Sequence, residues 1–239
     1  LGVSLVLKRF SMIGDGLSHV GFGALAIASA LGLAPLAVAV PVVVLAAVLL
    51  LRLSQNSKIK GDAAIAMISS SALAIGVVVI SVTTGMNTEV SSYMFGSVLS
   101  LSRGDAVLSV ILSIAVLLAF TLLYPRIFAV TFDETFSRAT GVRTDAYNTL
   151  IAVLTTVTVV LGMRMMGALL ISSLIIFPAL SAMRVCKSFR AVVLCSAAIS
   201  VVCFILGVLA SYFWETPTGA SVVIADLICF GLFSLLGKK

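Results

Sequence analysis

The sequence predicts an all-α polytopic membrane protein with about eight transmembrane helices, and three observations support this fold class. Of the 239 residues, 61% are apolar and 10% are charged, against roughly 45–50% and about 25% in an average soluble domain. A soluble fold of this length has too little interior to bury so many apolar side chains. Apolar stretches long enough to cross a bilayer recur along the chain, and eight spans of about 20 residues would use about 160 positions.

The chain opens with an apolar run over 1–7 that is too short to cross a membrane and ends at Lys8 and Arg9. A signal peptide would carry its basic residues before the apolar run. We therefore expect 1–7 to be the end of a truncated first helix, within a single transmembrane domain over 1–239. The spans predicted after it cover 11–33, 36–51, 63–84, 106–124, 147–162, 167–183, 191–213 and 219–236.

The segment 85–105, GMNTEVSSYMFGSVLSLSRGD, is amphipathic and too polar to cross completely. A short interfacial or re-entrant helix over 91–101 suits this pattern, provided that protein or water surrounds any open backbone.

Basic residues are distributed unevenly over the predicted loops. With eight crossings, one side of the membrane holds 13 of the 15 lysines and arginines, and only Arg103 and Arg164 fall on the other. The positive-inside rule makes the rich side the cytoplasm, together with the loop 125–146 and the C-terminus. The net charge of +6 therefore requires no nucleic-acid partner. The 13 residues are Lys8, Arg9, Arg52, Lys58, Lys60, Arg126, Arg138, Arg143, Arg184, Lys187, Arg190, Lys238 and Lys239.

Several kinds of chemistry are excluded by the residues present. The four cysteines lie in or next to apolar stretches without a CxxC pair, which is typical of buried small side chains and not of a disulfide framework or thiolate metal site. No Walker sequence is present, so we expect no ATP hydrolysis by this chain itself. We also expect no permanently bound cofactor. The cysteines are Cys186, Cys195, Cys203 and Cys229.

Two ionisable residues in the first full span predict a metal half-site. Asp15 and His19 are four residues apart, so on a helix both side chains project from the same face. A carboxylate oxygen and an imidazole nitrogen are suitable ligands for a divalent first-row metal, and glycines and alanines around them allow close helix packing. Two ligands do not complete a site, so other helices or water must supply more. Alternatively, Asp15 caps the helix and His19 bonds a neighbouring helix.

The remaining polar residues within spans are harder to interpret. Asp226, in SVVIADLICF of the last span, fits a second metal carboxylate, a proton relay or a hydrogen-bonded acid equally well. The mid-span serines at 69–71 and 172–173 favour helix packing over a polar path.

Six stretches taken together resemble the permease subunits of metal-ion ABC importers, the ABC-3 family, which handle zinc, manganese and iron. The resemblance covers essentially the whole chain and is specific for the family but weakly specific for the metal. The stretches are RFSMIGDGLSHVGFGALAIA, GDAAIAMISSSALAIGVVV, SSYMFGSVLSLSRGD, TFDETFSRATGV, MMGALLISSLIIFPALSAMRV and SYFWETPTGASVVI.

The resemblance implies a fold similar to the cobalamin-importer type of ABC permease, in a bacterial cytoplasmic (inner) membrane. The implied partners are an ABC ATPase subunit that hydrolyses ATP, an extracytoplasmic metal-binding protein, a second permease copy forming a homodimer, and membrane lipid. In this family the aspartate and histidine of the GDxxSH segment are implicated in handling the ion mid-membrane, which corresponds to Asp15 and His19. Asp226 departs from the family's usually apolar last span.

The identity of the transported ion is predicted only broadly. Imidazole is a poor ligand for calcium, so a zinc or manganese ion is expected. The look of the segment around Asp15 and His19 slightly favours zinc over manganese.

The segment TFDETFSRATGV occupies the place where importers of this type carry the helix that docks into the ATPase. Asp133 and Glu134 stand at the expected start of a short helix, Arg138 follows Glu134 by four residues, and Gly141 ends it. An ordinary capped surface helix predicts the same local pattern, so only the resemblance implies docking.

Three other functions remain open at this point. A siderophore- or cobalamin-type ABC permease would need a wide vestibule, where buried Asp15 and His19 would be less useful. A proton-coupled secondary metal carrier would use Asp15 and Asp226 as relays and would need no ATPase. In a non-transporting membrane scaffold, the polar residues would serve helix packing alone.

Overall fold

The computed structural model describes residues 1–8, 10–56, 61–83 and 103–237, and over these residues the chain is helical without a strand. The helix expected at 91–101 lies outside the described residues. The helices are α1 (Gly2–Leu7), α2 (Ser11–Ala30), α3 (Pro35–Asn56), α4 (Gly61–Thr83), α6 (Arg103–Leu122), α7 (Tyr124–Phe132), α8 (Glu134–Ala139), α9 (Thr144–Met166), α10 (Ala168–Val185), α11 (Phe189–Trp214) and α12 (Thr218–Leu236).

Six helices of the described part of the chain are long and apolar enough to cross a membrane, and a bent pair raises the number to seven. The six are α3, α4, α9, α10, α11 and α12, and the bent pair is α6 with α7. α2 is long enough but is not among them, because Asp15, His19 and several glycines make it less apolar. The all-helical, multi-span prediction is confirmed, whereas the count of about eight is not.

The bend between α6 and α7 replaces the expected end of a span at residue 124. α6 runs to Leu122, the axis then turns by 69°, and α7 continues to Phe132. Pro125 lies in the first turn of α7, where a proline is tolerated because its missing N–H has no helical partner there. The expected loop 125–146 therefore contains two helices, α7 and α8.

A single residue joins α9 to α10, where the sequence predicted a break of several residues. α9 continues to Met166, and Gly167 is both the C-cap of α9 and the N-cap of α10. Gly167 has φ 88° and ψ 156°, a backbone conformation that side-chain-bearing residues rarely adopt. The turn between the two helices therefore depends on this glycine.

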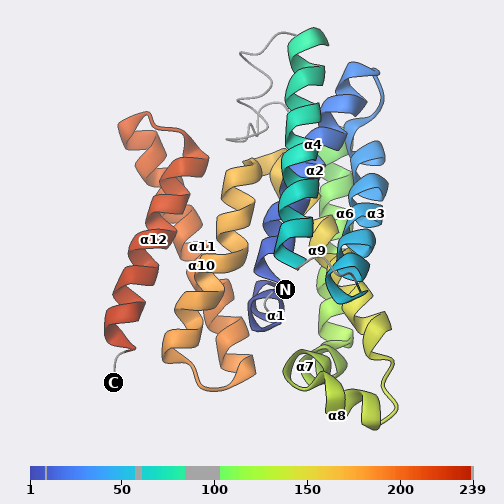
Figure 1. Cartoon of the computed structure of the whole chain (residues 1–239). Coiled ribbons are helices and arrows are strands. Elements are labelled where there is room, and N and C mark those ends of the chain that lie inside the picture. The colour runs from blue at the N-terminus through green and yellow to red at the C-terminus, as the bar shows by residue number, and fades with distance from the viewer. Residues whose placement is uncertain (9, 57–60, 84–102, 238–239) are drawn as a thin grey trace.

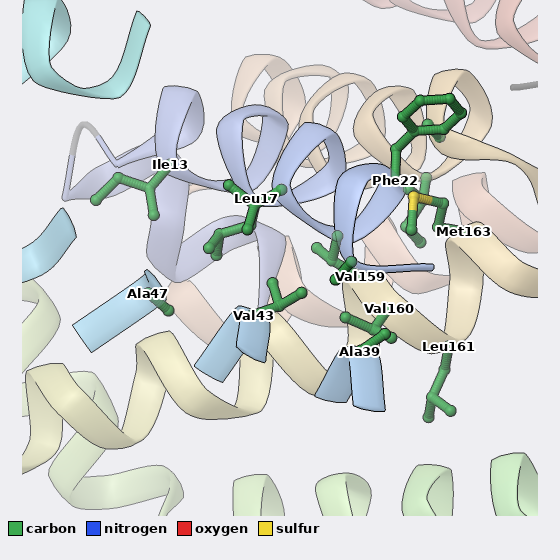
Figure 2. Packing of buried hydrophobic residues seen from close by; sticks show 14 of the residues in the cluster. Ile13, Leu17, Phe22, Ala39, Val43, Ala47, Val159, Val160, Leu161 and Met163 are labelled. Atoms are coloured by element: carbon green, nitrogen blue, oxygen red, sulfur yellow. The ribbon is translucent and has the colours of Figure 1, made fainter. Parts of the chain in front are cut away.

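α2 lies at the centre of the bundle and packs against α3, α4, α9 and α10. Its apolar side chains, among them Leu17 and Phe22, meet those of α3 and α9 in the larger of two buried clusters (Figure 2). Close approach to α4 requires Gly23, since a Cβ there would lie 2.7 Å from the carbonyl oxygen of Ala72. A second cluster joins α1, α10 and α11 around Ala179 and Phe189.

The two short helices α7 and α8 lie at one end of the bundle, together with the C-terminus and the turn between α10 and α11 (Figure 1). This end carries Arg126 in α7, Arg138 in α8 and Lys187 in the turn. Arg103 begins α6 at the opposite end. Among the described residues named here, three basic residues thus lie at one end of the bundle and Arg103 at the other.

Candidate metal site and the short helix α8

One face of α2 lines a cavity between helices. Asp15, Ser18, His19 and Phe22 follow one another at helical spacing and form one wall of a cavity of about 210 Å³. α4 contributes Leu73 to this cavity, and α10 contributes the residues Ala168, Leu169 and Ser172. The acid–imidazole pair therefore faces a space between three helices, and this space is partly open, since the cavity-lining Leu169 is 41% exposed.

The geometry of the pair is compatible with one shared ion. The Oδ2 atom of Asp15 lies 3.8 Å from the Nε2 atom of His19, with side chains 43% and 31% exposed. That separation is too long for a hydrogen bond. Ligand atoms at 2.0–2.2 Å from one zinc ion can be separated by up to about 4.4 Å. The two atoms can thus contact the same metal without a large movement of the helix.

Two serines add hydroxyl groups to the cavity. Ser18 donates a hydrogen bond of 2.6 Å to the carbonyl oxygen of Asp15, and Ser172 lies 3.5 Å from the Ser18 hydroxyl. Neither serine was predicted as a site residue. Ser18 had a usable signal, because it stands three residues after Asp15 and thus shares its face. For Ser172 the mid-span position left a polar path open but favoured helix packing, and it did not distinguish Ser172 from its neighbour Ser173.

The protein ligands for a metal are incomplete at this cavity. Among the residues that the structure describes, no group of three or more His, Cys, Asp or Glu side chains lies close enough to hold a metal ion. An ion at Asp15 and His19 would therefore need oxygen atoms from hydroxyls, backbone or water. A small ligand set is suited to an ion that must leave again.

Asp226 lies apart from this pair. It is 1% exposed, and its Oδ2 atom accepts a hydrogen bond of 2.9 Å from Ser173 across the contact between α12 and α10. Its Oδ1 atom has no hydrogen-bond partner in the structure. Asp226 does not line the cavity of Asp15 and His19. The structure therefore brings together two of the three predicted metal residues.

The short helix α8 has the caps that the sequence predicted. Asp133 is its N-cap, and its carboxylate accepts a hydrogen bond of 2.8 Å from the backbone N–H of Phe136. At the other end Gly141, with φ 84°, donates to the carbonyl of Arg138, and Val142 donates to that of Ser137. This pair of bonds is a Schellman motif, in which glycine takes the left-handed position.

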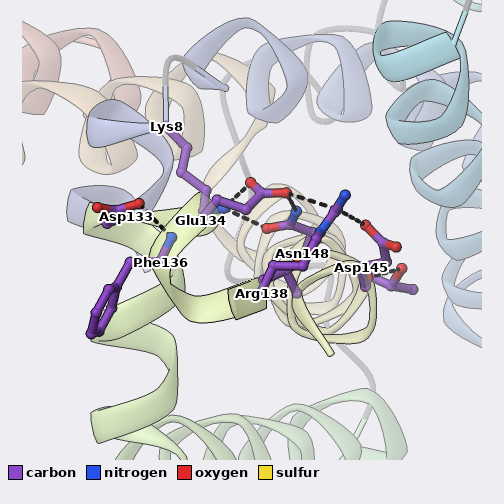
Figure 3. Close-up of polar contacts among 9 residues, drawn as sticks. Lys8, Asp133, Glu134, Phe136, Arg138, Asp145 and Asn148 are labelled. Carbon is purple, nitrogen blue, oxygen red and sulfur yellow. Dashed lines mark hydrogen bonds and ion pairs between the residues drawn. The ribbon is translucent and has the colours of Figure 1, made fainter. Parts of the chain in front are cut away.

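α8 has two different sides. Glu134 and Arg138 face the rest of the chain, with 3.7 Å between Glu134 Oε1 and Arg138 Nη2. Phe136 points away from them (Figure 3) and is 64% exposed. An exposed aromatic ring on a capped helix is a feature of surfaces that bind other proteins.

Glu134 joins α8 to two distant parts of the chain. Its Oε2 atom lies 3.2 Å from Nζ of Lys8, and its Oε1 atom accepts a hydrogen bond of 3.1 Å from Asn148 of α9. Lys8 also donates to Oδ1 of Asn148, which completes a ring of three side chains (Figure 3). Sequence analysis missed this ring because Lys8 and Glu134 are 126 residues apart.

The environment shifts the titration of both charged groups. Burial lowers the pKa of the Lys8 ammonium, although the charge and hydrogen bond of Glu134 act in the opposite direction. Burial also opposes ionisation of Glu134, but the hydrogen bond from Asn148 and the charge of Lys8 outweigh it. The pKa of Glu134 therefore lies below its ordinary value.

Together, the spans and the cavity define a multi-span helical membrane protein with an acid and an imidazole facing a cavity between helices. The chain belongs to the ABC 3 transport family (ABC-3), whose family model matches residues 1–237. The family expected from the sequence motifs is confirmed.

The chain is similar to proteins named for two different metals. It is 29% identical to the "Manganese import system permease protein ScaB" of Streptococcus gordonii over 239 residues, covering 100% of this chain and 86% of that protein. It is 28% identical to the "High-affinity zinc uptake system membrane protein ZnuB" of Haemophilus influenzae, covering 97% of this chain and 89% of that protein.

A solved structure has a similar fold. "PsaBC from Streptococcus pneumoniae in complex with Fab" matches with a TM-score of 0.87 and 28% identity, over 97% of this chain and 83% of that chain. The arrangement of helices described above is thus shared with a structure of related sequence.

Proposed function

We propose that this chain is the membrane-spanning permease subunit of an ATP-driven importer of divalent transition-metal ions, located in a bacterial cytoplasmic membrane. The observation that carries the proposal is the placement of Asp15 and His19 on one face of α2, lining a cavity between α2, α4 and α10. Family membership supports it, because similar proteins are named as manganese and zinc permease or membrane proteins. Both ions are therefore included, with the slight preference for zinc that the sequence suggested.

The proposed mechanism is alternating access without covalent chemistry. An extracytoplasmic binding protein delivers the ion, which Asp15 and His19 hold for a short time with hydroxyl or water oxygen atoms. Binding and hydrolysis of ATP by separate partner subunits then opens the path toward the basic end of the bundle. This end is proposed to be cytoplasmic, with the C-terminus, in agreement with the positive-inside rule.

The proposed ATPase-docking element is α8, with Asp133 and Gly141 shaping its ends. Its exposed Phe136 and the short, doubly capped helix support this role. A second copy of the chain completes the pore in the proposed assembly, and the apolar outer faces of α6, α11 and α12 meet lipid or that copy.

The test is transport by the chain reconstituted in vesicles with its ATPase and binding protein. ATP-dependent uptake of radioactive zinc and manganese is measured for the unaltered chain, Asp15→Ala and His19→Ala. Both variants are expected to lose most of the uptake while keeping the amount and melting temperature of the folded protein. Normal uptake in both would remove the proposed metal site, and uptake driven by a proton gradient without ATP would favour a secondary carrier.

A further inference from the structure

The position of Lys8 links two parts of the proposed mechanism. Lys8 is the C-cap of α1, and α2 begins at Ser11, three residues further along the chain. On α2 itself, Asp15 and His19 stand about 6 Å and 12 Å from Ser11, at 1.5 Å per helical residue. A displacement of the first turn of α2 along its axis would be carried to the cavity, because a hydrogen-bonded helix is stiff along its length.

The ring around Lys8 is held more firmly than a surface ion pair. The Lys8 side chain is 6% exposed and Asn148 is 2% exposed, whereas Glu134 is 40% exposed. A buried ammonium that loses its acidic partner keeps the cost of its burial without compensation. Lys8 and Glu134 are thus expected to move together.

The other ion pairs of α8 do not reach α2. Arg138 pairs with Asp145 at 3.0 Å, at the start of α9, with side chains 63% and 79% exposed. Of the ion pairs among the described residues, Lys8–Glu134 is the one that joins α8 to the junction of α1 and α2. α8 therefore takes part in two ion pairs that can be compared: Glu134 with Lys8, which reaches the junction of α1 and α2, and Arg138 with Asp145, which does not.

We propose that the ring of Lys8, Glu134 and Asn148 transmits movement of α8 to α2, so that ATP hydrolysis at the docking surface changes the metal cavity. The inference rests on the proposed function, since it takes α8 as the ATPase-docking helix. Lys8 and Glu134 are positioning residues in it, because neither contacts the ion.

The experiment measures ATP hydrolysis and uptake of radioactive zinc or manganese in the same vesicles, containing the permease, ATPase and binding protein. The readout is the number of ions imported per ATP hydrolysed, together with the affinity of the ATPase for the permease. Lys8→Gln and Glu134→Gln are expected to lower ions per ATP about fivefold or more while ATP hydrolysis and ATPase affinity stay near normal. Asp145→Asn removes the acidic partner of Arg138 on α8; as the matched control, it is expected to leave ions per ATP unchanged.

Variants that restore the ion pair between positions 8 and 134 test whether the pair transmits movement or only supports folding. The conservative variant Lys8→Arg and the exchange of Lys8→Glu with Glu134→Lys are expected to recover a large part of the coupling. The proposal is overturned if the single variants lose ATP hydrolysis and uptake in equal proportion with weaker ATPase binding, which would make the ring part of the docking surface. It is also overturned if ions per ATP stay normal.

A second measurement does not depend on the metal. Leu169 lines the cavity and is 41% exposed, so Leu169→Cys in a chain without the four native cysteines reports access to the cavity. ATP is expected to change its rate of reaction with a maleimide, and Lys8→Gln to abolish that change. An ATP response that persists in Lys8→Gln contradicts the inference even if Asp15 and His19 prove not to bind metal.

Discussion

Ser172 and Ser173 are neighbours on α10, yet their hydroxyl groups contact different helices. Ser172 lies 3.5 Å from the Ser18 hydroxyl at the cavity, whereas Ser173 donates a hydrogen bond of 2.9 Å to buried Asp226 on α12. Adjacent helical residues project about 100° apart, so one helix can separate two polar environments. The cavity and the α10–α12 contact are therefore two sites, and substitutions should separate them.

The two serines form a matched pair for mutation. Ser173→Ala would leave Asp226 without its donor, and we expect a loss of about 1–3 kcal/mol in the free energy of unfolding with little change in the KM for metal uptake. Ser172→Ala should instead raise the KM with little change in stability. Thermal unfolding and vesicle uptake check both, and equal effects of the two variants would contradict the separation.

Asp226→Asn tests whether the second acid of the spans contacts the ion. Because Asp226 lies outside the cavity, we expect uptake within about twofold of normal, and the asparagine can still accept the hydrogen bond from Ser173. Asp15→Asn, the corresponding change at the cavity, should abolish most uptake. Should Asp226→Asn reduce transport as much as Asp15→Asn does, Asp226 belongs to the ion path.

Close packing of α2 on α4 predicts different costs for two glycine substitutions. Gly23→Ala places a Cβ 2.7 Å from a backbone oxygen, and we expect it to destabilise the protein by about 1–3 kcal/mol. Gly231→Ala in α12, where nothing lies within 4 Å of the added Cβ, should be neutral or stabilise the helix by up to about 1 kcal/mol. Thermal unfolding in one detergent compares them directly. A tolerated Gly23→Ala would mean that α2 and α4 lie further apart than described.

The ring of Lys8, Glu134 and Asn148 predicts a pH dependence. The pKa of Glu134 is lower in the folded protein than its ordinary value of 4.5, so ionised Glu134 contributes stability above pH 4.5 and loses it as the pH falls through the folded pKa. Glu134→Gln should therefore lower the melting temperature at neutral pH, and the difference should shrink on acidification below pH 4.5. A difference that stays constant down to acid pH would show that the carboxylate charge contributes nothing.

Local patterns predicted α8 well, because its start, its ion-pair spacing and its final glycine are all encoded within nine residues. The caps at Asp133 and Gly141 follow from such short-range preferences. The pair of Asp15 and His19 was likewise visible, since a helix fixes the relation of residues four apart.

Long-range relations were not predictable in the same way. Nothing near Lys8 indicates that Glu134 will be its partner, and nothing in the adjacent serines of α10 indicates which one faces the cavity. The number of spans was also not predictable from apolar length alone. Polar residues lower the hydropathy of α2, and a 69° bend divides the apolar segment of α6 and α7.

The joint at Gly167 limits how the wall of the cavity can move. Only Gly167 connects α9 to α10, so α10 cannot slide along its axis without pulling α9. Rotation of α10 about this glycine is the freer motion. A swivel of about 10° would shift Ser172 by about 1 Å but Val185, at the far tip, by about 5 Å, given 1.5 Å of rise per residue. The part of α10 that lines the cavity would thus move little, while the basic C-terminal end of the same helix swings widely.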